Sequence, residues 1–162
     1  MSDKQYAQAG RFMFIVAWIL FFGLMFLFFH YYTDSERGSY QINHGTVTIT
    51  PDKQGHYGID GYINEHPVKF MIDTGATLVA IPQTLASEMK LQGRYAVSIK
   101  TASGEVTGSL TRLEKLSFAN FTLNDIKAVI VPGGQDEMVL LGMNVLSQFN
   151  LSQQDKRLVI KK

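Results

Sequence analysis

The chain contains an uncharged apolar run of 18 residues near its N-terminus, from Phe12 to Phe29, with the sequence FMFIVAWILFFGLMFLFF. At about 1.5 Å of rise per residue, a helix of this length extends about 27 Å, close to the hydrocarbon thickness of a bilayer. A helix that is apolar on every side has no face for water, which argues against a buried core helix in a small domain. We therefore expect residues 12–32 to form a transmembrane anchor, with the rings of His30–Tyr32 at the level of the lipid headgroups.

A cleaved signal peptide is the main alternative for this run, and it requires a shorter apolar region followed by small residues at a cleavage site. The residues that follow the run are bulky (FFHYY), and Gly38-Ser39 lies far downstream, which favours an uncleaved anchor. Lys4 and Arg11 precede the run. The positive-inside bias therefore predicts that residues 1–11 are cytoplasmic and that the rest of the chain lies outside the cytoplasm.

Composition excludes several classes of function for the remainder of the chain. Residues 31–162 contain 13 Lys and Arg and 13 Asp and Glu, with no basic run, so nucleic acid is not an expected partner. The chain has no cysteine, which excludes disulfides, thiol nucleophiles and Cys-bound zinc. His44, His56 and His66 have no second ligand three or four residues away, so we expect no metal site. The sequence contains no glycine-rich phosphate loop, so we expect no cofactor.

A polar segment, 33–43, is expected to link the anchor to a single domain at 44–162. Within that domain, short β-branched or alternating segments are separated by Gly, Pro, Asn and Asp, which is typical of an all-β fold. Two short helices are expected, at Pro82–Lys90 and Asn144–Phe149. The expected strands are Thr46–Thr50, His56–Ile63, Val68–Ile72, Thr77–Ile81, Tyr95–Ala102, Glu105–Leu113, Lys115–Phe118, Thr122–Val131, Met138–Leu141 and Leu158–Ile160.

The stretch Val68–Pro82, VKFMIDTGATLVAIP, places a carboxylate, Asp73, between two apolar runs. A charge beside a buried strand is costly unless it is paired, hydrogen-bonded or used. We expect the strand to end in a turn at Asp73, in which Gly75 lets the backbone pass close beneath the carboxylate. A D-T-G triplet alone is weak evidence, because turns favour Asp and Gly. The flanking apolar runs make it a candidate catalytic loop.

Asp-Thr-Gly between two apolar strands resembles the active-site loop of aspartic proteases. Leu140-Leu141-Gly142 followed by a helix is similar to the segment that lies beside that loop in the family, and the hairpin Ser98–Gly108 takes the place of the flap. Either segment alone would also suit an ordinary strand or hairpin. Together, the order of elements resembles the retropepsin-like single-lobe aspartic proteases, and most of all the membrane-anchored bacterial ones, some of which act in the periplasm.

The resemblance implies an all-β, retropepsin-like single-lobe acid protease barrel with two short helices, preceded by one transmembrane helix. It assigns the catalytic role to Asp73. It further implies an active-site loop of Thr74, Gly75, Ala76 and Thr77, a flap tip of Ala102, Ser103 and Gly104, and loop support from Leu140, Leu141 and Gly142. Two departures stand out: Met143 replaces an arginine common in retroviral enzymes, and the flap is not rich in glycine.

Peptide hydrolysis by this chemistry needs two carboxylates that share a proton, and the chain has a single D-T-G. The second Asp73 must then come from another chain across a twofold axis, so we expect a homodimer. The function expected is that of a membrane-anchored aspartic endopeptidase acting on protein or peptide substrates outside the cytoplasm, in the periplasm of a Gram-negative bacterium. The alternative is a catalytically silent, membrane-tethered peptide-binding module on the same fold. The unfamiliar flap favours this alternative, whereas the intact Asp73-Thr74-Gly75 argues against it.

Overall fold

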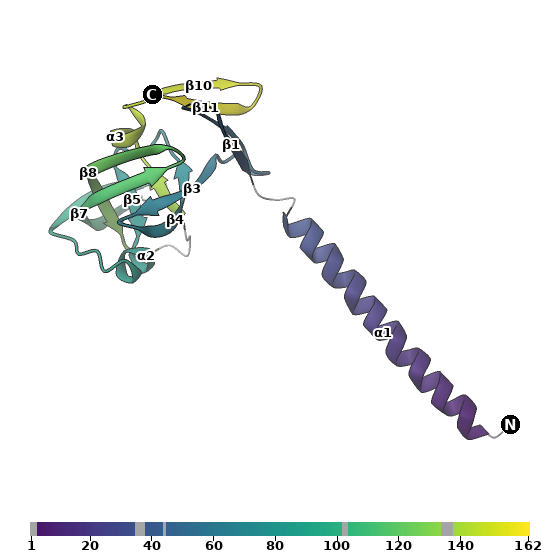
Figure 1. The fold of residues 1–162 in the computed structure, drawn as a ribbon. Helices are drawn as coiled ribbons and strands as arrows, with labels where there is room; N and C mark the ends of the chain where they lie inside the picture. The colour runs from purple at the N-terminus through teal and green to yellow at the C-terminus, as the bar shows by residue number, and fades with distance from the viewer. Residues whose placement is uncertain (1–2, 35–37, 44, 102–103, 134–137) are drawn as a thin grey trace. The chain divides into compact units, whose positions relative to one another are not determined.

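The structure is a computed structural model that describes residues 3–34, 38–43, 45–101, 104–133 and 138–162. The chain divides into two compact units, Met1–Arg37 and Gly38–Lys162, drawn in Figure 1. Each unit is described by itself.

The first unit is a single helix, α1 (Asp3–Asp34). The side chains of Phe12–His30 are all exposed, and this stretch is long and apolar enough to cross a membrane. The indole of Trp18 stacks on the ring of Phe22 with centroids 5.4 Å apart. The expected apolar helix is therefore present. A signal sequence near an N-terminus can also be long and apolar enough to meet this description.

The first and last strands of the second unit form a four-stranded antiparallel sheet, which we call the terminal sheet. Its order is β1-β2-β11-β10. Apolar residues alternate along the two central strands, and Val47, Ile49, Leu158 and Ile160 are buried on the same side. The strands are β1 (Ser39–Asn43), β2 (Thr46–Thr50), β10 (Asn150–Gln154) and β11 (Arg157–Lys161).

The other seven strands form the main sheet, in the order β3-β4-β9-β5-β8-β7-β6 (Figure 1). Strand β3 also pairs with β7, so the sheet closes on itself as a small barrel. Strand β9 lies between β4 and β5 and runs parallel to β4. The elements are β3 (Gly58–Ile63), β4 (His66–Ile72), β5 (Val79–Pro82), α2 (Gln83–Glu88), β6 (Tyr95–Thr101), β7 (Gly104–Phe118), β8 (Phe121–Val131), β9 (Met138–Leu141) and α3 (Met143–Leu146).

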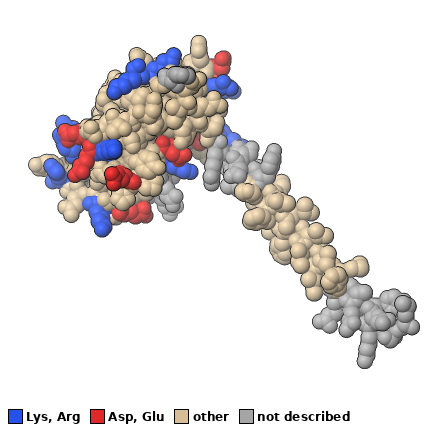
Figure 2. Space-filling model, viewed as in Figure 1, with Lys and Arg blue, Asp and Glu red and all other residues tan. Residues whose placement is uncertain are grey.

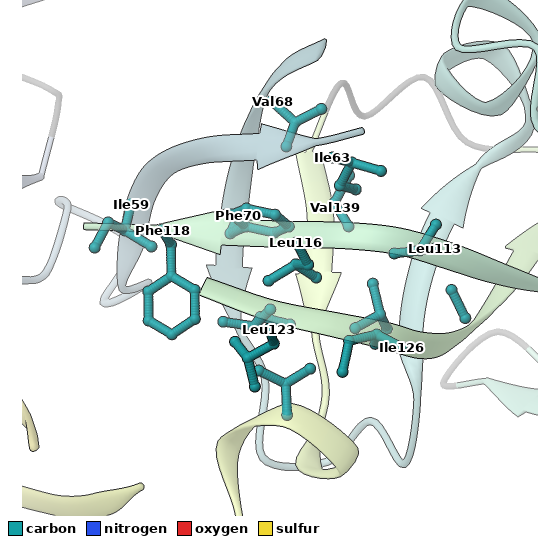
Figure 3. Close-up of a cluster of buried hydrophobic side chains, with 14 of the residues drawn as sticks. Ile59, Ile63, Val68, Phe70, Leu113, Leu116, Phe118, Leu123, Ile126 and Val139 are labelled. Atoms are coloured by element: carbon teal, nitrogen blue, oxygen red, sulfur yellow. The ribbon is translucent and has the colours of Figure 1, made fainter. Parts of the chain in front are cut away.

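Buried aromatic and aliphatic side chains fill this barrel, as Figure 3 shows. The rings of Phe70 and Phe118 meet edge to face, with centroids 6.4 Å apart. A Cβ on Gly61 would lie 2.2 Å from the carbonyl oxygen of Ser117 and 2.7 Å from the ring of Phe70. A residue without a Cβ is therefore what allows β3 to approach β7 and close the barrel.

The predicted fold class is confirmed, and three details differ from the expectation. Residues 105–118 form one strand, β7, where we expected two. Glu114 and Lys115 are consecutive exposed residues, opposite Asn124 and Asp125 on β8, and Asp125 has a φ of 58°. The alternation of buried and exposed positions shifts there in both strands, so the hairpin bends without breaking.

Strands β1 and β10 are the other differences. Residues 39–43, which we expected to belong to the linker, pair with β2 along their whole length. Their sequence, SYQIN, is mostly polar and was not recognised as a strand. Strand β10 has one strongly apolar residue, Leu151, and its pairing is set by a two-residue turn at Asp155 and Lys156, whose φ values are 48° and 60°.

Candidate active site

Asp73 follows the last residue of β4, between two strands that hold its backbone. The N–H of Ile72 donates to the carbonyl oxygen of Tyr57 (2.9 Å), and the N–H of Asp73 donates to the carbonyl oxygen of Leu141 on β9 (3.2 Å). Phe70, two residues before Ile72, is fully buried and fixes the register of β4. The strand therefore ends with Asp73 half-buried at the surface of the barrel.

The residues after Asp73 form a tight turn that returns to its carboxylate. The N–H of Gly75 donates to Asp73 Oδ1 (2.8 Å), and the N–H of Ala76 donates to the carbonyl oxygen of Asp73 (3.3 Å). A Cβ on Gly75 would lie 3.1 Å from Asp73 Oδ1. The expected close approach at Gly75 is therefore present. Thr74, Gly75 and Thr77 are exposed, so the loop faces solvent.

The segment after β9 supports this loop through backbone hydrogen bonds. The N–H of Met143 donates to the carbonyl oxygen of Ala76 (2.8 Å), and the N–H of Asn144 donates to the carbonyl oxygen of Thr77 (3.0 Å). Gly142, which directly precedes these two residues, is buried. The structure thus brings the predicted Asp73–Thr77 loop together with the predicted Leu140–Gly142 support. Leu140 pairs with Met71 and Ala80, on either side of β9.

Asn144 is a supporting residue that the sequence did not single out. Its Oδ1 accepts from the N–H of Val79 at the start of β5 (3.1 Å), and its Nδ2 donates to the carbonyl oxygen of Lys127 on β8 (2.8 Å). One amide side chain therefore joins the C-terminal end of the candidate loop to the neighbouring strand. The available signal was an Asn two residues after Gly142, next to the segment predicted to support the loop.

Tyr57 is a second residue that sequence reasoning missed. Its backbone binds Ile72, as described above, while its hydroxyl accepts from Gln153 Nε2 (2.8 Å) and donates to the carbonyl oxygen of Lys156 (3.3 Å). Tyr57 therefore connects the residue before Asp73 to the β10–β11 hairpin of the terminal sheet. No sequence pattern indicated this contact, because the partners lie almost a hundred residues apart.

Strands β6 and β7 form the hairpin that we expected at Ser98–Gly108. Ala102 and Ser103, two of the three predicted tip residues, lie outside the described residues. Gly104 opens β7 with a φ of 122°, and Thr101 Oγ1 donates to its carbonyl oxygen (2.7 Å). Over the part of the chain that the structure describes, no hydrogen bond joins this hairpin to Asp73.

Asp73 lies outside the groove that one chain forms beside β1 and α2. This groove, about 1150 Å³ in volume, is lined by residues of β1, β3, β4, α2 and the end of β7, with Met138 of β9, and Asp73 is not among them. Among all the residues that the structure describes, no group of three or more His, Asp or Glu side chains is placed to hold a metal ion. The geometry offers one accessible carboxylate on a rigidly supported loop.

Comparison with known proteins identifies a family that this chain matches. The family described as gag-polyprotein putative aspartyl protease matches residues 59–148, a range that includes Asp73, the β6–β7 hairpin and Gly142. A solved structure of a retropepsin-like aspartic protease from Rickettsia conorii superposes with a TM-score of 0.62 and 24% sequence identity. The match covers 76% of this chain and 94% of that chain, so the two share a fold.

Two curated relatives are uncharacterized proteins. One, from Rickettsia prowazekii (strain Madrid E), is 29% identical over 119 residues, which is 72% of this chain and 51% of the relative. The other, from the cobV 5′ region of a Sinorhizobium species, is 26% identical over 110 residues, 66% of this chain and 47% of the relative. The chain therefore spans about half the length of the curated relatives it matches.

Proposed function

This chain belongs to the gag-polyprotein aspartyl protease family, with the retropepsin-like single-lobe fold, and we propose that it is an aspartic endopeptidase whose catalytic group is Asp73. The observation that supports this most is the loop itself. Asp73 is half-buried at the end of β4, whose inward side chains are buried, its Oδ1 accepts from Gly75, and its backbone is bound to Leu141. A carboxylate held in this way keeps its position while one face remains open to substrate and water.

The chemistry needs a second carboxylate, and we propose that it is Asp73 of another copy of the chain. Two carboxylates in contact cannot both ionise, so the pair holds one proton. The ionised carboxylate takes a proton from a water molecule, and the oxygen of that water attacks the peptide carbonyl carbon. At the same time, the protonated carboxyl group gives its proton to the carbonyl oxygen. The tetrahedral intermediate then collapses. The carboxyl group that took the proton from water gives it to the amide nitrogen, which leaves as an amine, and the other carboxylate takes a proton from a hydroxyl of the intermediate.

The open setting of Asp73 supports a shared site. Within the described residues of one chain, the groove beside β1 and α2 does not include Asp73, and no hydrogen bond joins the β6–β7 hairpin to Asp73. A twofold axis beside the loop would place two copies of Asp73-Thr74-Gly75 against each other. The substrate would then be an extended peptide bound between the paired loops and the two hairpins.

We further propose that α1 anchors the enzyme in a membrane. The stretch Phe12–His30 is long and apolar enough to span the bilayer, and Lys4 and Arg11 precede it. The catalytic domain would then lie outside the cytoplasm, in the periplasm of a Gram-negative cell. Confinement to a plane would also raise the effective concentration of the two chains that share a site.

The test is hydrolysis of a peptide library by the full chain in membranes, with Asp73→Asn as the variant and Asp60→Asn as the matched control. Asp60 is an exposed aspartate on β3 outside the site. Asn at position 73 still accepts from Gly75, so folding should persist while cleavage falls by at least about 10²–10⁴-fold, the usual contribution of general acid–base catalysis. Undiminished cleavage by Asp73→Asn would refute the assignment. An inactive wild-type chain that binds the peptides would support the silent binding module instead.

A further inference from the structure

The terminal sheet has an outward face with no acidic residue. Residues directly opposite each other in the sheet point to the same side, and Val47, Ile49, Leu158 and Ile160 occupy the buried side. The outward side therefore receives three residues from each strand. Strand β2 contributes three threonines, β1 and β10 contribute Ser, Asn and Gln residues, and β11 contributes Arg157, Val159 and Lys161.

The cations on this face are exposed and available. Arg112, on the main sheet, pairs with Asp125, whereas among the described residues neither Arg157 nor Lys161 forms an ion pair. Lys156 in the adjoining turn and Lys162 beyond β11 add two further positive charges, against one carboxylate, Asp155. Figure 2 shows Lys and Arg side chains gathered over this part of the domain.

The charge of the domain is unevenly distributed. Residues 150–162 contain four Lys and Arg and one Asp, a formal charge of +3, and residues 38–50 contain no Asp, Glu, Lys or Arg. Residues 51–149 contain eight Lys and Arg and ten Asp and Glu, a formal charge of −2. An electric field from an anionic surface would therefore turn the domain so that the terminal sheet faces that surface.

The chain itself indicates which anionic surface is close. Residues 35–38 lie between the end of α1 at Asp34 and the start of β1 at Ser39. A chain advances at most about 3.6 Å per residue, so this connection reaches about 18 Å at most. If α1 spans a bilayer, the strand that begins the terminal sheet can never be far from the lipid headgroups.

We propose that the outward face of the terminal sheet binds an anionic phospholipid surface through Arg157 and Lys161, with hydroxyl and amide side chains of β1, β2 and β10 donating hydrogen bonds to phosphate oxygens. Lysine and arginine near an anionic bilayer are attracted to it within a Debye length, about 10 Å at 0.1 M salt. This inference rests on the proposed membrane anchor. It orients the domain with the β10–β11 hairpin at the membrane, and Tyr57 connects that hairpin to the strand before Asp73.

Because the chain has no cysteine, a single label can test the orientation in the full chain. Ser152→Cys places a fluorophore on the outward face of β10, and Thr122→Cys places one at an exposed position of β8. Each labelled chain is incorporated into nanodiscs of phosphatidylcholine, alone or mixed with anionic phosphatidylglycerol, with a nitroxide quencher on the headgroups. We expect strong quenching at position 152 in the anionic discs, several-fold less in the neutral discs, and no dependence on lipid charge at position 122.

Substitutions of the two cations provide the matched comparison. The double variant Arg157→Gln/Lys161→Gln should lose the charge-dependent quenching at position 152, and Arg157→Lys/Lys161→Arg, which keeps both charges, should retain it. Quenching that is indifferent to lipid charge and to both double variants would overturn the proposal while leaving the anchor in place. A chain that does not co-elute with the discs at all would overturn the anchor and this proposal together. Loss of the quenching at position 152 when double-stranded DNA is added to the disc-bound chain, at DNA concentrations that also bind the lipid-free chain, would assign the face to polyanions in general and also overturn it.

Discussion

The carbonyl oxygen of Leu78 lies directly over Gly142, so that a Cβ added to Gly142 would be 2.4 Å from it. The same Cβ would lie 2.9 Å from the carbonyl oxygen of Ala76. Real Cβ atoms do not approach backbone oxygens so closely. The loop that follows Asp73 therefore packs directly on the residue after β9. This close packing is possible because Gly142 has no side chain.

Gly142→Ala should disrupt this contact. Neither neighbour can move without displacing the loop, so we expect destabilisation of about 1–3 kcal/mol, the usual cost of overpacking. Urea denaturation followed by far-UV circular dichroism would measure the change in the free energy of unfolding. Gly58→Ala on β3 is the control, since its Cβ would meet the carbonyl oxygen of Phe70 at an ordinary 3.8 Å. Equal stability of the two variants would contradict the close packing at Gly142.

Asn144→Ala should loosen the same loop from its other end. The substitution removes the hydrogen bonds to Val79 and Lys127, each worth about 0.5–1.5 kcal/mol, so a loss of about 1–3 kcal/mol is expected. Hydrogen exchange should show faster exchange at the Val79 amide. Asn124→Ala, at an exposed position of β8, should leave both measurements unchanged. Unaltered protection of Val79 in Asn144→Ala would show that the amide bridge does not hold β5.

The sequence predicted the parts of the site that depend on local pattern. Asp73, Gly75 and Gly142 occupy positions where an apolar strand meets a turn, and the structure places their segments together. Asn144 and Tyr57 were missed because their roles depend on partners distant in sequence: Val79 lies 65 residues from Asn144, and Lys156 lies 99 residues from Tyr57. Such pairings leave no periodicity in the chain.

The same reasoning explains the strands. Strands β2 and β9 have the bounds that their sequences predicted, Thr46–Thr50 from its alternation and Met138–Leu141 from its apolar run. Strands β1 and β10 lie at the edges of the terminal sheet and are largely exposed, so polar residues serve there and the period-two signal is weak. Edge strands of this kind are recognised from their hydrogen-bonded neighbours rather than from their own residues.

Tyr40 should make folding stability sensitive to alkaline pH. Desolvation, with a smaller contribution from the Asp60 carboxylate, raises the pKa of Tyr40 above its ordinary value of 10.0. A raised pKa in the folded state means that the stabilisation is fully present below pH 10 and is lost as pH rises through the folded value. The stability of the wild type relative to Tyr40→Phe should therefore stay constant between pH 7 and 9 and decrease above pH 10. Tyr95→Phe, which removes the hydroxyl of an exposed tyrosine, is the control.

The orientation of the anchor can be read from a reporter fused after Lys162. Since Lys4 and Arg11 precede the apolar stretch, we expect alkaline phosphatase, which is active only outside the cytoplasm, to be active in this fusion. Lys4→Gln/Arg11→Gln removes the bias and should lower that activity. A fusion that is produced but has no phosphatase activity would overturn the proposed topology, and release of the domain from membranes by cleavage after α1 would identify a signal sequence.

If each active site contains Asp73 from two chains, activity should depend on pairing. At low density in the membrane, the rate of peptide cleavage should rise with the square of the amount of wild-type chain. Mixing wild type with an excess of Asp73→Asn should suppress cleavage beyond simple dilution, because mixed dimers have one ionisable carboxylate and cannot share a proton. Gly142→Ala added in the same excess is a useful comparison: chains whose loop is displaced should compete for partners less well. A rate that stays linear in wild-type chain and is indifferent to added Asp73→Asn would mean that a single chain is sufficient, and the two-carboxylate mechanism would fail.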